Sequence, residues 1–355
     1  MLNKPQTRRA TAAAALAFAS LLGLPTDLSA QRDPSNAVTF ALSIENDVFS
    51  GTDRNYTNGT KLSWDFAEAG TYRDIEQLPG WVQLLASKKP STLEDSIGFG
   101  ATLSVGQNIY TPKNKEATEL IRDDRPYAGW TYLSLALRER RGLTTDTLEL
   151  TLGLVGPDSY AEDIQNWIHE KIGSTIANGW DNQLKNEFGG IVAWRRDSEL
   201  FRIPESQTGW GADLNSSFGL AAGTIQSYVH AGGNLRFGYN RGAPAAPPRI
   251  RPGVTSPFPA SENDPRLNRD LNRSGFFLTF GAEGRYVAQN IFIEGNTWAD
   301  SHGLEEHEYV SDVYGGATLI AGDWTFSYVY TIRSEEFVGQ EDPHEFGGIT
   351  IARTF

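Results

Sequence analysis

Apolar and polar positions alternate with a period of two along most of the chain. Between residues 97 and 109, apolar residues such as Phe99 and Leu103 alternate with glycine and hydroxyl residues such as Thr102 and Ser104. Four leucines occupy every second position from 148 to 154. Because successive side chains of a β-strand point to opposite faces, each such segment predicts a strand with one apolar and one polar face.

Twelve segments show this pattern. They are residues 38–46, 56–67, 96–109, 127–139, 146–155, 186–196, 209–221, 227–240, 275–289, 309–321, 323–334 and 345–355. A tilted strand needs about nine to eleven residues to cross a bilayer, and bacterial barrels have an even number of strands. The pattern therefore predicts an all-β fold, a transmembrane antiparallel up-and-down β-barrel of about 12 strands.

A soluble β-sandwich with core aromatics is the main alternative fold. In this chain, however, the apolar and polar faces persist for whole strands, and aromatic residues gather at strand ends. These aromatics are Trp64, Tyr110, Tyr127, Trp130, Trp194, Trp210, Tyr239, Tyr286, Trp324 and Tyr328. Such positions are typical of the interfacial girdles of a membrane barrel, which we therefore favour.

The N-terminus has the layout of a secretory signal peptide. Lys4, Arg8 and Arg9 precede an apolar run of about fifteen residues, and small residues precede Gln31. The run is too short to span a bilayer as a helix. We expect residues 1–30 to be the signal peptide and residues 31–355 to form one outer-membrane barrel domain.

Composition excludes some classes of function. The formal net charge of −13 argues against a nucleic-acid partner, because such proteins are usually basic. The chain has no cysteine, which excludes disulfides and a thiol nucleophile.

Loop parity separates the connecting segments into two groups. In an up-and-down barrel, alternate loops lie on the same rim. The turn-rich segments 68–95 and 241–274 are therefore predicted to lie on the periplasmic side. The three most polar connections, residues 47–55, 110–126 and 156–185, would then meet at the outer rim.

The third polar connection contains the one helix that the sequence predicts outside the signal peptide. Isoleucines recur every four residues from 164 to 172, Asp158 or Ser159 can cap the start, and Gly173 can end the helix. Gln165 and His169 are one turn apart and can point into the same space. The sequence thus predicts one short helix in an extracellular loop.

His169 is the natural candidate for a general base, because histidine titrates near neutral pH. The alternative is a histidine on a solvated helix surface. His302 and His307 could pair on a metal, although a solvated surface explains them as well. No Gly-x-Ser-x-Gly elbow is present, so direct attack by water is the simpler hydrolytic route.

Oxygen-rich side chains precede and follow the first polar connection. Asn46, Asp47 and Thr57 offer hard oxygen ligands of the kind that calcium prefers. Their spacing is not that of an EF-hand, and a solvated acidic loop is the alternative. Lys115, or Lys113, could pair with an anionic head group or polarise a carbonyl group.

Four stretches together resemble the lipid A 3-O-deacylase family of Gram-negative outer membranes. They are "END…GTDRNYTNG", "QNIYTP…DDRPYAGW", "VGPDSYAEDIQNWIHEKIG" and "GWDNQL". The resemblance runs from about Phe40 to Phe355 and is densest before residue 190. The combination is specific, whereas no single stretch is.

The resemblance implies a site between the barrel wall and a loop helix, near the outer leaflet. It implies calcium-dependent hydrolysis of the 3'-linked acyloxyacyl chain of lipid A. The asparagine–aspartate pair of the family corresponds to Asn46 and Asp47, its threonine to Thr57 and its histidine to His169. Its lysine corresponds most nearly to Lys115.

Three functions are therefore expected in turn. The first is a lipid A deacylase of the bacterial outer membrane that acts on lipopolysaccharide with Ca²⁺. The second is an outer-membrane phospholipase with the same water-and-calcium chemistry. The third is a non-enzymatic, porin-like barrel. The sequence leaves the oligomeric state open.

Overall fold

Twelve antiparallel strands close into one barrel in the computed structural model, which describes residues 37–47, 55–88, 98–173, 175–203, 209–241, 247–251 and 274–355. The predicted signal peptide lies outside these residues. The strands are β1 (Val38–Asn46), β2 (Asn55–Ala69), β3 (Gly98–Thr111), β4 (Ala128–Arg141), β5 (Thr144–Val155), β6 (Glu187–Ile203), β7 (Trp210–Gly223), β8 (Gln226–Tyr239), β9 (Ser274–Asn290), β10 (Tyr309–Ala321), β11 (Trp324–Arg333) and β12 (His344–Thr354).

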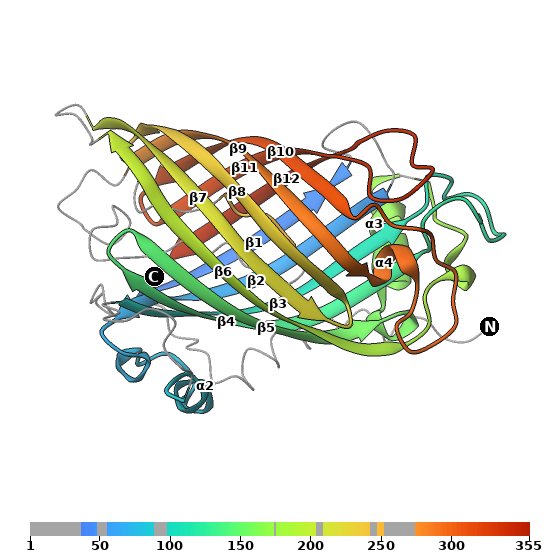
Figure 1. Cartoon of the computed structure of the whole chain (residues 1–355), viewed down its shortest axis with the longest axis horizontal. Coiled ribbons are helices and arrows are strands. Elements are labelled where there is room, and N and C mark those ends of the chain that lie inside the picture. Colours follow the sequence, from blue (N-terminus) through green and yellow to red (C-terminus); the bar gives the residue numbers. More distant parts are fainter. Residues whose placement is uncertain are drawn as a thin grey trace.

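Each strand pairs with its neighbours in sequence, and β1 pairs with β12 to close the barrel (Figure 1). This confirms the predicted up-and-down topology. The predicted strand ends lie within two residues of the observed ones except in β6, which continues to Ile203 instead of ending at 196. The register between β6 and β7 shifts between Glu199 and Phe201. A bulge interrupts the two-residue alternation and so hides the end of the strand.

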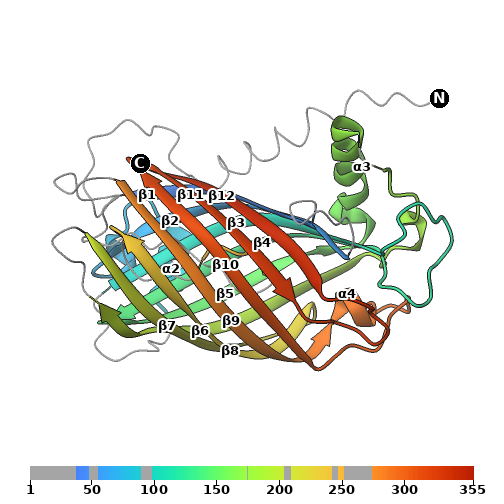
Figure 2. The ribbon, with the colours of Figure 1, turned by 90° about the horizontal axis from the view of Figure 1, so that it is seen from above.

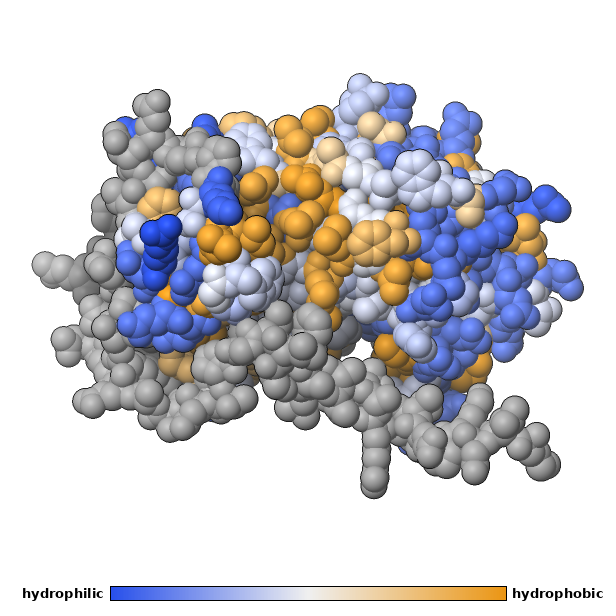
Figure 3. Space-filling model, turned by 90° about the horizontal axis from the view of Figure 1, so that it is seen from below, coloured by the Kyte–Doolittle hydropathy of each residue, from blue (hydrophilic) through white to orange (hydrophobic). Residues whose placement is uncertain are grey.

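The two faces of the wall differ as the alternation predicts. On β5, Leu150, Leu152 and Leu154 are exposed, whereas Glu149 and Thr151 are buried in the lumen. Apolar side chains gather over the middle of the face shown in Figure 3, and hydrophilic ones dominate one end. The outer wall is thus suited to lipid and the lumen to polar groups.

Paired charges fill the lumen. The Asp312 carboxylate of β10 is bound by Arg333 at 2.8 Å, Arg285 at 3.1 Å and Arg249 at 3.4 Å. Each of these four side chains is at least 90% buried. Buried charges require such partners because they have lost their hydration.

Part of the long connection between β8 and β9 also lies inside the barrel. Arg249 and Arg251 are buried there, Arg251 pairs with Glu283, and the Ile250 N–H donates to Glu45 Oε1 at 2.6 Å. The prediction that 241–274 is simply a periplasmic loop was therefore wrong for residues 247–251. Lumen carboxylates bind its arginines, a tertiary relationship that loop composition does not reveal.

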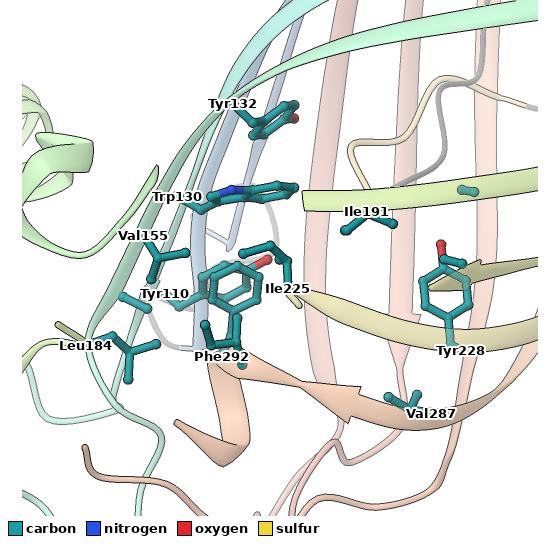
Figure 4. Packing of buried hydrophobic residues seen from close by; sticks show 14 of the residues in the cluster. Tyr110, Trp130, Tyr132, Val155, Leu184, Ile191, Ile225, Tyr228, Val287 and Phe292 are labelled. Atoms are coloured by element: carbon teal, nitrogen blue, oxygen red, sulfur yellow. The ribbon is translucent and has the colours of Figure 1, made fainter. Parts of the chain in front are cut away.

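Aromatic packing closes the lumen near the end that carries the polar connections. Tyr110 stacks on Phe292 with ring centroids 4.2 Å apart, and Trp130 packs on Tyr132 at 4.4 Å (Figure 4). Tyr110 and Trp130 were predicted to belong to the interfacial girdle, and this was wrong. They lie on the inward parity of β3 and β4, which position at a strand end does not reveal.

Three helices are described: α2 (Gly80–Ala86), α3 (Ala161–Ile172) and α4 (Ile291–Glu294). Only α3 was predicted. It lies with α4 at one end of the barrel, and α2 lies at the opposite end (Figures 1 and 2). In the described residues, no helix combines the length and the hydropathy needed to cross a membrane.

Candidate functional site

Helix α3 is docked against the outer surface of strands β3 and β4. An added Cβ at Gly129 of β4 would come within 2.2 Å of both Ala161 Cβ and Ser159 Oγ. Such distances are far below van der Waals contact, so only glycine permits this approach. The sequence of β4 is thus fitted to the start of α3.

Polar groups on the outward face of the wall hold the turn that precedes α3. Gln107 Nε2 donates to the Ser159 carbonyl oxygen at 2.7 Å and to Thr131 Oγ1 at 3.0 Å. Thr131 Oγ1 donates to the same Ser159 oxygen at 2.7 Å. Outward polar residues are costly on a wall that faces lipid, and here the turn satisfies their hydrogen bonds.

The ends of α3 match the sequence prediction at one end only. Gly173 ends the helix at φ 70°, as predicted, and its N–H donates to the His169 carbonyl. The predicted caps Asp158 and Ser159 were wrong, because both belong to a short 3₁₀ turn and Tyr160 is the N-cap. Ser159 is occupied by the wall and by its bond to the Gly156 carbonyl.

His169 lies on α3 and is 6% exposed. Its Nδ1 atom is 2.5 Å from the Thr175 carbonyl oxygen. A carbonyl can only accept a hydrogen bond, so Nδ1 carries the proton in the neutral ring and Nε2 keeps its lone pair. This is the tautomer that a general base requires.

Gln165 lies one helical turn before His169 and is also buried. Its Oε1 atom accepts a hydrogen bond from Trp180 Nε1 at 3.0 Å, which fixes the orientation of the amide. Its Nε2 atom is buried and has no hydrogen-bond partner within the described part of the chain. A buried donor of this kind can be satisfied by a ligand oxygen.

The first polar motif lies two strands away from α3 on the same rim. Asn46, the last residue of β1, pairs with Asn58 of β2, and Asn58 pairs with Ile109 of β3. Ile109 packs in one cluster with Ala161 of α3. Adjacent strands are about 4.8 Å apart, so the backbone of Asn46 lies roughly 10 Å from the strand that carries the helix.

The remaining residues of this motif divide into described and undescribed positions. Asp47 follows β1 and is fully buried. Thr57 lies at a register shift between Tyr56 and Asn58, and bulges are common beside active sites. The side chain of Thr57 and residues 48–54 lie outside the described residues.

Sequence reasoning missed Asn58. This residue shares the outward face with Thr60, whose hydroxyl donates to Asn58 Oδ1 at 3.1 Å. A polar pair on the otherwise apolar face of β2 was a visible signal in the alternation, because Leu62, Trp64 and Phe66 continue the same face.

The two candidate lysines have different surroundings. Lys115 is buried, and its carbonyl oxygen accepts hydrogen bonds from the Asn178 N–H at 2.8 Å and from Tyr127 Oη at 3.2 Å. Lys113 is about half exposed and pairs with Glu341 at 2.9 Å. The fold therefore ties Lys115 to the segment after α3 and directs Lys113 to solvent.

The rest of the rim is structural. Arg125 of the "DDRPYAGW" stretch is buried, lies 3.6 Å from Glu336 and stacks over Tyr110 at 5.2 Å, in agreement with its expected role as a rim brace. His302 Nε2 bonds to the Asp124 carbonyl oxygen at 3.0 Å. Among the residues that the structure describes, no group of three or more His, Asp or Glu is placed to hold a metal ion.

One carboxyl group on this rim has a perturbed pKa. Burial, followed by repulsion from Glu294 and Glu336, raises the pKa of Glu306 to about 7. Glu306 pairs through its backbone with Phe337, which joins two loops of the rim.

Comparisons with known proteins agree with this arrangement. Residues 13–355 match the sequence model of the family described as outer membrane protein LpxR. The structure of LpxR from Salmonella typhimurium superposes with a TM-score of 0.69 at 18% identity, covering 89% of this chain and 100% of that one. At this identity the likeness concerns the fold.

Weaker structural matches involve autotransporter barrels. The β-domain of the Bordetella autotransporter BrkA matches with a TM-score of 0.42 at 10% identity, covering 90% of this chain and 98% of that one. The translocator domain of NalP from Neisseria meningitidis gives 0.39 at 9% identity, covering 98% and 97%. No curated protein gives a significant sequence match.

Proposed function

Because the chain belongs to the LpxR family of outer-membrane proteins, we propose that it is a lipid A 3-O-deacylase. The reaction is hydrolysis of the ester that links the 3'-acyloxyacyl chain to lipid A. Membership of an outer-membrane β-barrel family supports an outer-membrane location and a function related to lipid A. The observation that carries the proposal is a buried histidine on a helix docked against the lipid-facing wall.

His169 is the general base in this proposal. The Thr175 carbonyl retains the proton on Nδ1, so Nε2 can take a proton from the attacking water. Docking by Gly129, Gln107 and Thr131 fixes the helix that carries the ring. Such positioning is what allows one imidazole to act repeatedly on the same bond.

Two further groups are suited to the negative charge that develops on the ester carbonyl oxygen. The buried Nε2 of Gln165 lies one turn from His169 and lacks a hydrogen-bond partner among the described residues. Lys115, whose backbone is held beside the segment after α3, supplies a positive charge. Donors fixed before the reaction stabilise an oxyanion more effectively than mobile ones.

The oxygens near the end of β1 fit a calcium ion in kind. Asp47 offers a fully buried carboxylate, and Asn46 and Thr57 add amide and hydroxyl oxygens of the hard type that Ca²⁺ binds. When bound, the ion supplies Lewis acidity toward the ester carbonyl. A buried carboxylate is also stabilised by a nearby cation.

An amphiphilic substrate fits this location. The polar outward residues Asn58, Thr60 and Gln107 lie on a wall whose other outward residues are apolar. A lipid embedded in the leaflet can approach such a site from the side, with its acyl chains against the wall. The lumen, filled by ion pairs and by residues 247–251, argues against a passive porin.

A phospholipase uses the same chemistry, so the test must distinguish the two substrates. Purified full-length protein is reconstituted with lipopolysaccharide and phospholipid, with and without a calcium chelator. Mass spectrometry then follows both lipids. We expect lipid A to lose its 3'-acyloxyacyl chain with calcium only, and phospholipid to stay intact.

The variants for this test are His169→Ala and, as a matched control, His307→Ala, which alters an exposed histidine of the same rim. The first should lose deacylation by about 10²–10⁴-fold, the usual contribution of a general base. The second should keep it. Full activity of His169→Ala, or release of fatty acid from phospholipid alone, contradicts the proposal.

A further inference from the structure

The connection between β2 and β3 folds back over the outside of the barrel. Residues of this connection, among them Tyr72, Leu78 and Val82, form one cluster with Phe66 of β2 and Leu137 of β4. Both strand residues lie on the outward parity of the wall. Leu137 is only 7% exposed, whereas Leu133 on the same outward face of β4 is 42% exposed. The connection therefore replaces lipid over this part of the wall.

Specific contacts fix this connection in place. Tyr72 Oη donates to the Arg138 carbonyl oxygen at 2.9 Å, and the Tyr72 ring meets Phe99 edge-on at 5.1 Å. Gln83 Nε2 bonds to the carbonyl oxygens of Ile75 and Leu78, each at 3.0 Å. The short helix α2 is thus part of the wall.

Helix α2 has a second apolar face that points away from the protein. Val82 and Ala86 are buried against the wall, whereas Trp81, Leu84 and Leu85 are 48%, 55% and 54% exposed. Positions i, i+3 and i+4 lie on one side of a helix, so these three side chains form one patch. A clustered apolar patch of this kind marks an interaction surface.

The location of the patch identifies its partner. Trp64, an outward residue of the predicted aromatic girdle, packs against the cluster under α2 and meets Phe40 edge-on at 5.5 Å. The patch therefore continues the lipid-facing surface at the height of the girdle. It does so at the end opposite α3, which is the periplasmic side when α3 lies at the outer leaflet (Figures 1 and 2).

We infer that α2 is an interfacial anchor whose Trp81, Leu84 and Leu85 side chains insert into the periplasmic leaflet of the outer membrane. Its partner is the phospholipid of that leaflet, at the boundary between head groups and acyl chains. Tryptophan and leucine are the side chains that amphipathic helices use at this depth. The exposed Arg73 and Lys88, just outside the helix, suit the head-group level.

The absence of cysteine from the sequence makes a direct test available. Leu84→Cys carries a nitroxide label in full-length protein reconstituted in phospholipid vesicles. Electron paramagnetic resonance then measures its accessibility to oxygen, which concentrates in lipid, and to a water-soluble nickel chelate. Leu152→Cys on the outward wall and Lys88→Cys beside the helix are the lipid and water references.

We expect the ratio of oxygen to nickel accessibility at Leu84→Cys to be at least several-fold higher than at Lys88→Cys and close to that at Leu152→Cys. A ratio equal to that at Lys88→Cys overturns the inference. So does low accessibility to both reagents, or spin–spin broadening, because these indicate a protein partner or a second copy. Trp81→Cys replaces Leu84→Cys if the latter does not give a heat-resistant barrel.

Discussion

The carbonyl oxygen of Lys115 accepts a hydrogen bond from the Asn178 N–H at 2.8 Å. This bond ties the connection between β3 and β4 to the segment that follows α3. Thr175, whose carbonyl holds His169, belongs to the same segment. The candidate base and the candidate lysine are therefore positioned by one short stretch of chain.

Replacing Lys115 separates its charge from its backbone role. Lys115→Met keeps the carbonyl bonds to Asn178 and Tyr127 and removes only the ammonium group. We expect lipid A deacylation to fall about 10- to 100-fold, as for loss of a charged hydrogen bond. Lys113→Met, which breaks only the exposed pair with Glu341, should leave the rate unchanged. The reverse order of effects would assign the role to Lys113.

Gly129→Ala tests the docking of α3. The new Cβ would clash with Ala161 and Ser159, and overpacking of this kind costs about 1–3 kcal/mol. We expect the helix to shift and activity to fall at least tenfold, while the barrel keeps its heat-resistant mobility on gels. Gly284→Ala is the control, because no atom lies within 4 Å of its added Cβ. Normal activity of Gly129→Ala would show that the close approach is dispensable.

Asp47→Asn tests the proposed calcium ligand. The amide lacks the negative charge of the carboxylate, so the calcium concentration for half-maximal deacylation should rise at least tenfold. Saturating calcium should restore part of the activity. Asp123→Asn, an exposed change on the same rim, should leave the calcium dependence as it is. An unchanged calcium titration for Asp47→Asn would place the ion elsewhere.

Asp312→Asn tests the lumen network. The change leaves Arg249, Arg285 and Arg333 without their shared carboxylate. Removing one partner of a buried ion pair typically costs about 3–5 kcal/mol, so the urea midpoint of unfolding should fall clearly. Glu119→Gln in an exposed part of a loop is the control and should unfold like the wild type. Equal midpoints would mean that the network contributes no net stability.

Glu306 gives the rim a pH dependence. Its pKa of about 7 in the folded state exceeds the ordinary value of 4.5, so the folded loop binds the proton more tightly than the unfolded loop does. The stability of the loop should therefore fall as pH rises from about 4.5 to 7. Hydrogen-exchange protection of the Leu304 and His307 amides, corrected for intrinsic rates, measures this effect. Glu306→Gln should abolish the slope, and a persistent slope would assign it to another group.

The sequence by itself determined the barrel and the order of its strands. Alternation is strong wherever one face of a strand meets lipid and the other meets a polar lumen, so Leu150 and Glu149 already reveal their faces. The repeat of isoleucines and Gly173 likewise determined where α3 lies and where it ends. These signals are local, because they depend only on spacing along one element.

The tertiary structure decided what the elements contact. Loop composition did not reveal that Arg249 enters the lumen or that Val82 covers the outer wall, since both depend on partners far away in sequence. Position at a strand end likewise did not reveal that Trp130 points inward. His169 and Asn46 were candidates from sequence, but strand pairing through Asn58 and Ile109 is what puts them on one rim. Spacing fixes the face of a residue, whereas only closure of the barrel and docking of α3 fix its neighbours.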